Sequence, residues 1–138
     1  MKVVIDCNVW VSFGLGHGLG HLPGIIRNPR IKIFHSSELL NELKEVLQRP
    51  KIKARITRRR YLEIFELIRR FSDQVELKEI RKFSGDPKDS YLLALCKKSS
   101  ANYFVTNDEL LQSLKKVNGT RIISYKHFLE ILRFEFPE

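Results

Sequence analysis

Short continuous apolar runs follow one another along the chain with stretches whose apolar residues recur at helical spacing, and this predicts a fold that mixes strands and helices. Short apolar runs, many of them β-branched, have the length and composition of buried strands. A weaker run of the same kind stands at Val75–Leu77. The clearest runs, each expected to form a strand, are Val3–Ile5, Ile31–Phe34, Asn102–Thr106 and Arg121–Ile123.

Apolar residues at helical spacing predict the remaining elements. The clearest helix follows Ser36, a favoured N-cap residue, and carries Leu39, Leu43 and Leu47 on one stripe before Pro50 ends it. Residues 51–55 are expected to form a basic connector. The other expected helices are a single turn at Trp10–Phe13, a short helix at Leu22–Arg27, and helices over Thr57–Phe71, Ser90–Lys98, Glu109–Leu114 and from Ser124 to about Leu132.

Strands that alternate with helices favour an α/β sandwich built on a mainly parallel sheet. With 138 residues, 43% of them hydrophobic, we expect a single domain that spans residues 1–138. No apolar run approaches the ~18 residues needed to cross a bilayer, and no signal segment opens the chain. We therefore expect a cytoplasmic protein without membrane contact.

The first predicted strand leads directly into an acid, Asp6. Parallel sheets place their chemistry just beyond the carboxyl ends of strands, which makes Asp6 a candidate catalytic residue. Capping the helix that follows is an equally reasonable role for an aspartate at this position. The other acids of the chain bear on this choice.

Two more acids are placed by the pattern toward the same edge. Asp108 follows the Tyr103–Thr106 run as Asp6 follows the first strand, so parallel neighbouring strands would bring both carboxylates together. Glu42 falls about 40° beyond Val46, at the border of the apolar stripe of its helix. It can therefore reach a site at the edge of the core, although most helix glutamates face solvent.

Asp89 and Asp86 flank the start of a later helix. Asp89 shares a helix face with Leu92 and Cys96, so its carboxylate is expected to turn inward, where it needs a partner. Asp86 precedes Pro87, and this arrangement also suits an ordinary helix N-terminus. We therefore treat Asp89 as a candidate ligand and Asp86 as a supporting acid.

Carboxylates that share a cleft repel one another, by about 4 kcal/mol for a pair ~4 Å apart at an effective dielectric near 20. A bound cation removes this repulsion. A set of oxygen ligands without a ring of His or Cys favours Mg²⁺ or Mn²⁺. Such ions activate water and polarise phosphate esters, so the acids indicate phosphodiester cleavage.

Basic residues outnumber acidic ones, 25 to 16, which gives a formal charge of +9 and favours nucleic acid as a partner. A cluster of cations lies between two predicted helices and at the start of the second. Contact with RNA and a simple solvated face explain this cluster about equally well. The candidate RNA-binding residues are Lys51, Lys53, Arg58 and Arg59.

Four short segments, in order along the chain, complete the pattern. They are VIDCNVWV at 4–11, SSELLNEL at 36–43, DPKD at 86–89 followed by LLAL at 92–95, and YFVTND at 103–108. Together they resemble the PIN domain family, and within it the toxin components of toxin–antitoxin pairs. One departure is Cys7, which stands where the family usually has Thr.

The resemblance implies a three-layer α/β/α sandwich with a central parallel sheet of about five strands. It also implies a metal-dependent ribonuclease that cleaves single-stranded RNA, with an antitoxin protein and a homodimer as possible assemblies. Its catalytic and metal-binding acids map onto Asp6, Glu42, Asp89 and Asp108, and its supporting residues onto Asn8, Thr106 and Asp86.

Two other functions compete with this one. A phosphatase of the haloacid-dehalogenase type also uses an aspartate at a strand end, but its motif needs a second Asp where this chain has Asn8. The stronger alternative is a catalytically weak nucleic-acid- or antitoxin-binding module of the same fold.

Overall fold

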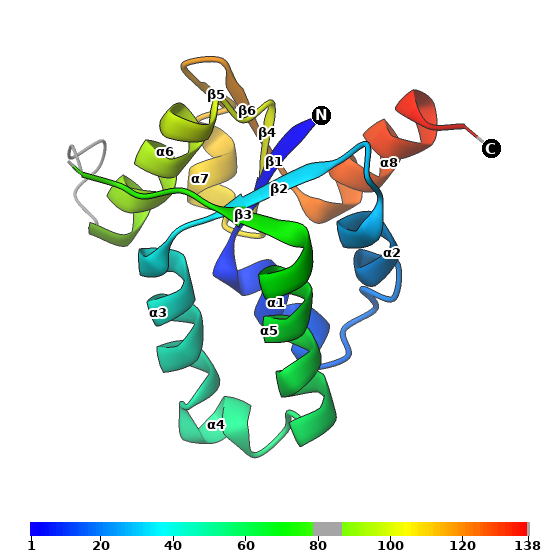
Figure 1. Cartoon of the computed structure of the whole chain (residues 1–138), viewed down its shortest axis with the longest axis vertical. Helices are drawn as coiled ribbons and strands as arrows, with labels where there is room; N and C mark the ends of the chain where they lie inside the picture. The colour runs from blue at the N-terminus through cyan, green and yellow to red at the C-terminus, as the bar shows by residue number, and fades with distance from the viewer. Residues whose placement is uncertain (79–86, 138) are drawn as a thin grey trace.

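The computed structural model describes residues 1–78 and 87–137, with the side chains of residues 87–89 not included. A sheet of six strands in the order β3-β2-β1-β4-β6-β5 forms the centre of the molecule (Figure 1). Its strands are β1 (Lys2–Ile5), β2 (Lys32–His35), β3 (Ser72–Gln74), β4 (Tyr103–Val105), β5 (Lys116–Val117) and β6 (Thr120–Ile123).

Five of these strands run parallel, which confirms the predicted sheet. The sixth, β5, was not predicted and pairs antiparallel with β6 at the sheet edge. It is only two residues long, so no alternation of polar and apolar residues marks it. Asn118 has a positive φ of 54° in the tight turn between β5 and β6.

Helices pack on both faces of the sheet and give the predicted α/β/α sandwich. Figure 1 shows α1, α3 and α5 together on one side, with α4 at their far end, and α6 on the other side. The helices are α1 (Cys7–Gly14), α2 (Leu22–Arg27), α3 (Ser37–Leu47), α4 (Pro50–Lys53), α5 (Arg58–Phe71), α6 (Pro87–Ser99), α7 (Glu109–Ser113) and α8 (Tyr125–Glu135).

Besides β5, three elements differ from the prediction. The expected single turn at Trp10–Phe13 is a full helix, α1, because Asp6 caps it and its apolar residues are buried. The expected connector after Pro50 contains α4, since proline is favoured in the first turn of a helix. The strand expected at Val75–Leu77 lies three residues earlier, because backbone pairing with β2 places β3 at Ser72–Gln74.

The core lies between the sheet and its helices. Val3, Val4 and Phe104 of the two central strands are fully shielded from solvent, as are Leu43 of α3 and Phe128 of α8. In the part of the chain that the structure describes, no helix is long and apolar enough to cross a membrane.

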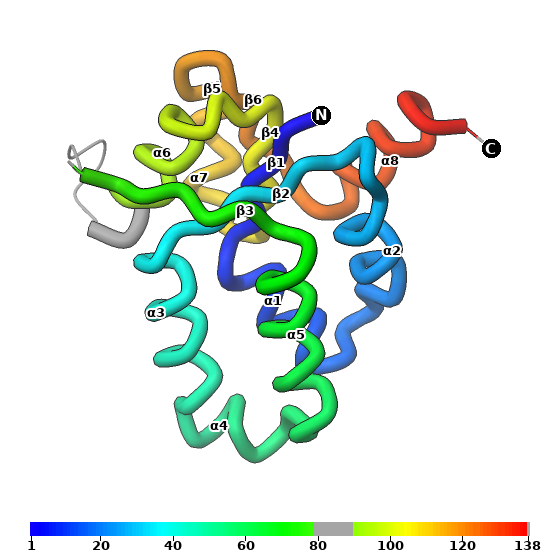
Figure 2. The backbone as a smooth tube through the Cα atoms, in the orientation of Figure 1, coloured from blue at the N-terminus to red at the C-terminus, as the bar shows by residue number. Residues whose placement is uncertain are grey.

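The strand β1 lies between β2 and β4, and this position decides where Asp6 is found (Figure 2). Val3, Val4 and Ile5 pair in parallel with Tyr103, Phe104 and Val105. The residue after each strand, Asp6 and Thr106, therefore emerges at the same edge of the sheet. The predicted relationship of these two strands as parallel neighbours is confirmed.

Candidate active site

Asp6 both caps a helix and lies at the centre of a polar cluster. It is the N-cap residue of α1, and its Oδ1 accepts a hydrogen bond of 2.7 Å from the backbone N–H of Cys7. Only 5% of its surface is exposed. The two roles considered for this aspartate are thus compatible, because each carboxylate oxygen has different partners.

The second carboxylate oxygen of Asp6 is held by two side chains. Thr106 donates from Oγ1 to Oδ2 over 2.8 Å, and Asn8 donates from Nδ2 over 3.3 Å. Asn8 also donates to Thr106 Oγ1 at 3.3 Å, and its Oδ1 accepts from the backbone N–H of Asn107 at 3.1 Å. Residues 6, 8, 106 and 107 therefore form one connected network around a single carboxylate.

Glu42 of α3 brings a second carboxylate to this place. Ligand atoms of Asp6, Cys7 and Glu42 all lie within 4.8 Å of one another. Glu42 is half-buried, as expected for a residue at the border of the apolar stripe. Burial, opposed in part by the Thr106 hydrogen bond and supported by the charges of Glu42 and Asp108, raises the pKa of Asp6 from 3.8 to about 6.

Cys7 contributes a thiol to this group. Its Sγ donates a weak hydrogen bond to the backbone carbonyl of Leu39 at 3.5 Å. Burial, followed by the neighbouring charges of Glu42 and Asp6, raises the pKa of the Cys7 thiol well above its usual value. The group is therefore a protonated thiol at neutral pH, whereas a metal ligand must be a thiolate.

Asp108 has a second task in addition to facing the site. Its Oδ1 accepts hydrogen bonds from the backbone N–H groups of Leu110 and Leu111, at 2.8 and 3.3 Å, and so caps α7. Its own N–H donates to Thr106 Oγ1 at 3.0 Å. The acid is thereby fixed beside the network around Asp6.

These residues open into a pocket of about 500 Å³ between α1 and α3. Asp6, Glu42 and Asp108 line it together, as the sequence predicted. Asp86, and the side chain of the predicted ligand Asp89, lie outside the described part of the chain. The complete lining is Asp6, Cys7, Asn8, Val11, Ser12, Glu42, Val46, Arg49, Leu92 and Asp108.

Two residues at this site had no predicted role in it. Arg49 is the one cationic side chain among the described residues that line the pocket. Tyr91 of α6 lies behind Glu42 and donates a hydrogen bond of 2.9 Å to its Oε1. Arg49 could have been noticed from its place next to the basic connector that follows Pro50, but no spacing in the sequence links Tyr91 to Glu42.

The side chains present suit a hard divalent cation. The pocket gathers carboxylate oxygens from Asp6, Glu42 and Asp108, which are the ligands that Mg²⁺ and Mn²⁺ prefer. The pKa of Asp6 is raised because burial, and next the charges of Glu42 and Asp108, make its ionised form unfavourable. A cation among them would relieve that cost, so the donor set fits the predicted ion.

The predicted RNA-binding cations follow Arg49 in the chain, on α4 and at the start of α5. Arg49 is the N-cap residue of α4, whose Lys51 and Lys53 are exposed to solvent. Arg58 and Arg59 begin α5 and are exposed as well. Figure 1 shows α4 at the end of α3 remote from the sheet, with the start of α5 after it.

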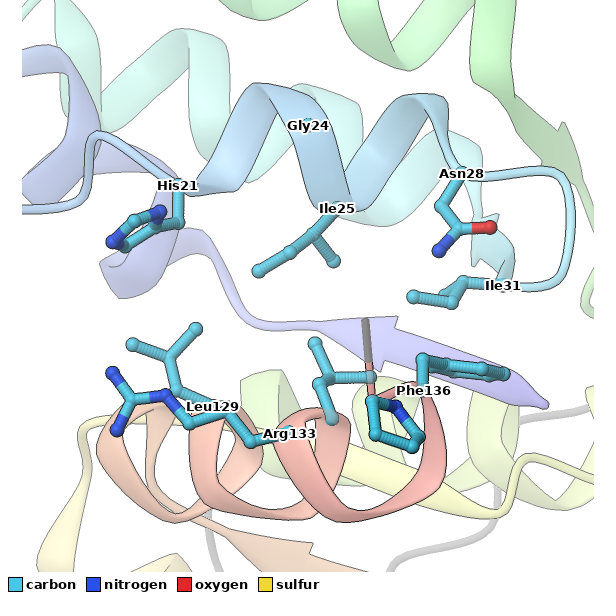
Figure 3. A pocket seen from close by; sticks show the side chains of 10 residues that line it. His21, Gly24, Ile25, Asn28, Ile31, Leu129, Arg133 and Phe136 are labelled. Carbon is cyan, nitrogen blue, oxygen red and sulfur yellow. The ribbon is translucent and has the colours of Figure 1, made fainter.

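A second groove, of about 550 Å³, lies between α2 and α8 (Figure 3). Ile25 faces Leu129 across it, with His21 and Arg133 at one end and Phe136 toward the other. No acid is found among the described residues that line this groove. It therefore lacks the carboxylate ligands that Mg²⁺ and Mn²⁺ prefer, in contrast to the first pocket.

A comparison with protein-family models finds a match to the PIN domain over residues 2–110. A search of curated proteins found no match. PIN domains are generally nucleases and typically use divalent metal ions. The matched region contains Asp6, Glu42 and Asp108, and the mostly parallel sheet is consistent with the PIN fold. The chain belongs to the PIN domain family.

Proposed function

We propose that the protein is a divalent-metal-dependent endoribonuclease that hydrolyses phosphodiester bonds in single-stranded RNA. The observation that carries this proposal is the meeting of the Asp6 and Glu42 carboxylates within 4.8 Å. Asp108 and Arg49 line the same pocket. Hydrolysis of a phosphodiester needs acids that hold a metal ion, and a positively charged side chain such as Arg49 beside them can bind the phosphate.

Each side chain has a role in this proposal. Asp6, Glu42 and Asp108, together with the predicted ligand Asp89, hold Mg²⁺ or Mn²⁺. When bound, the cation supplies a polarised phosphate and a water of lowered pKa. Asn8 and Thr106 fix the Asp6 carboxylate through the hydrogen bonds described above. Asp86 stays a predicted supporting acid.

The shape of the pocket supports an RNA strand that runs along it. Its lining extends from Asp6 at the sheet edge, past Glu42 and Val46, to Arg49 at the far end of α3. A strand with its scissile phosphate beside Asp6 would present the neighbouring phosphates to Arg49 and then to the cations of α4 and α5. Contacts of this kind bind the backbone without reading its sequence.

Cleavage of labelled RNA tests the function. Wild-type protein with Mn²⁺ should cut single-stranded RNA and leave duplex RNA of the same sequence intact, and EDTA should abolish cleavage. Asp6→Asn and Glu42→Gln should reduce cleavage to the EDTA background. Glu45→Gln is the matched control, because Glu45 lies on the same helix and is exposed.

A binding module of the same fold would behave differently. It would retain RNA without cutting it at any Mn²⁺ concentration, and Asp6→Asn would leave binding unchanged. That pair of results would replace the nuclease with the binding function.

We also propose that the enzyme is the toxin of a toxin–antitoxin pair, supported by the likeness of its four sequence segments to such toxins. Expression should then arrest growth, and Glu42→Gln should relieve the arrest. A small DNA-binding protein encoded by the adjacent gene should relieve it as well and should bind the toxin. Size-exclusion chromatography with light scattering tests the expected homodimer.

A further inference from the structure

We propose that Tyr91 is a positioning residue that holds the Glu42 carboxylate toward Asp6, an inference that rests on the proposed function. Tyr91 belongs to α6 and is only 5% exposed. Its hydroxyl donates a 2.9 Å hydrogen bond to Glu42 Oε1. The contact joins residues 49 positions apart, on α3 and α6, and α4, α5 and β3 lie between these two helices in the chain order.

Glu42 needs such a contact to stay at the site. Within the described residues it takes part in no ion pair. Its carboxylate lies beside that of Asp6, and like charges at this separation repel. A glutamate side chain with several rotatable bonds would relieve this repulsion by turning to solvent. The Tyr91 hydroxyl opposes that turn from the buried side.

The surroundings of the hydroxyl make its position definite. It lies 4.0 Å from Cys7 Sγ, and this thiol in turn contacts the Leu39 carbonyl of α3. The Tyr91 hydroxyl therefore lies next to Cys7 at the start of α1 and next to Glu42 in the middle of α3. Because the Tyr91 hydroxyl donates its hydrogen bond to Glu42, the position of the Glu42 carboxylate depends on the placement of α6.

Removal of one oxygen tests the proposal. Tyr91→Phe keeps the buried ring and deletes the hydroxyl. Mn²⁺ binding, measured by titration calorimetry, should weaken at least about tenfold, as is usual when the partner of a metal ligand is lost. The rate constant kcat for RNA cleavage should fall, while KM should change little because Tyr91 does not line the pocket.

Tyr125→Phe is the matched control. Tyr125 is also buried, at 6% exposure, and its hydroxyl has no hydrogen-bond partner among the described residues. This variant should bind Mn²⁺ like the wild type. If Tyr91→Phe binds Mn²⁺ as tightly as Tyr125→Phe does, and differs only in its melting temperature without metal, Tyr91 is merely structural and the proposal fails.

If Tyr91→Phe does not fold, a measurement on protein that keeps the Tyr91 hydroxyl still tests the proposal. The chain has four tyrosines, which can be replaced throughout by 3-fluorotyrosine and observed by fluorine NMR. Saturation with Mg²⁺ should shift the Tyr91 resonance and leave that of Tyr125 in place. A Tyr91 resonance that does not move would overturn the proposal.

Failure of the two proposals can be told apart. A wild-type protein that binds neither Mn²⁺ nor Mg²⁺ overturns the proposed function and this inference with it. A wild-type protein that binds Mn²⁺ and cleaves RNA, beside an equally active Tyr91→Phe variant, overturns this inference alone.

Discussion

The hydroxyl of Thr106 donates a 2.8 Å hydrogen bond to Oδ2 of Asp6, across 100 positions of sequence. The same oxygen of Thr106 accepts from Asn8 Nδ2 and from the backbone N–H of Asp108. One buried hydroxyl thus connects the end of β1 with the start of α7. Its three hydrogen bonds fix the Asp6 carboxylate relative to Asp108.

Replacement of this hydroxyl by a methyl group should impair both fold and function. Thr106→Val leaves the N–H of Asp108 without its partner and takes the shorter of two side-chain hydrogen bonds from Oδ2 of Asp6, which then keeps only the 3.3 Å contact from Asn8. Stability should therefore fall by about 1–3 kcal/mol. Urea denaturation measures this loss, and cleavage of single-stranded RNA should slow at least about tenfold.

Thr120→Val separates the two effects. Thr120 is buried as well, and its Oγ1 donates to the Ala101 carbonyl at 2.7 Å, away from the pocket. The control should lose stability but keep its activity per folded molecule. Equal cleavage rates for the two variants would remove Thr106 from the support of the site.

The raised pKa of Asp6 predicts how stability depends on pH. The folded value of about 6 exceeds the ordinary value of 3.8, so the folded state binds this proton more tightly than the unfolded state does. Asp6 should therefore lower the stability of the metal-free protein as pH rises from about 4 to about 6, by about 3 kcal/mol. Denaturation in EDTA at several pH values measures this trend.

Metal affinity should show the opposite dependence, because the ion and the proton compete for Asp6. The Mn²⁺ affinity at pH 5 should be about tenfold weaker than at pH 7.5. Glu42→Asn removes one of the charges that raise the Asp6 pKa, so in that variant the carboxyl carbon of Asp6 should titrate at lower pH by NMR. An affinity that stays constant between these pH values would contradict the assigned role of Asp6.

The exposed cations at the start of α5 should contribute to RNA binding through phosphates. Each contact with a single strand adds about 0.7 to the slope of log K against log salt, so Arg58→Ala with Arg59→Ala should reduce the slope by about 1.4. Binding is measured in EDTA to prevent cleavage. Arg69→Ala with Arg70→Ala, at the other end of the same helix, is the control and should keep the slope. A slope that the first pair leaves unchanged would place the RNA elsewhere.

Both cysteine thiols should be inert in the folded protein. Cys7 and Cys96 are 3% and 1% exposed, and burial raises the pKa of each. A thiol reagent such as DTNB should therefore label them only as fast as the chain unfolds, and both at once in denaturant. Rapid labelling of Cys7 alone would show a thiolate at the site, and with it a preference for softer metal ions.

The residues of the site differ in how far sequence alone could place them. Asp6 and Asp108 follow strand-like runs, and Glu42 borders a helical stripe, so local periodicity was enough to bring all three toward one edge. Tyr91 depends on how α6 approaches α3, which no local spacing encodes. The same holds for β3, since its pairing with β2 and not its own composition fixes its position.

The family match ends at residue 110, but the folding unit continues beyond it. The strand β6 pairs with β4, and the backbone N–H of Thr106 donates to the Ile123 carbonyl at 2.9 Å. A chain cut at the end of the match would leave β4 as a bare edge strand, open to pairing with other molecules and to aggregation. It would also leave the backbone N–H of Thr106 without its partner, at the sheet edge where Asp6 and Asp108 lie.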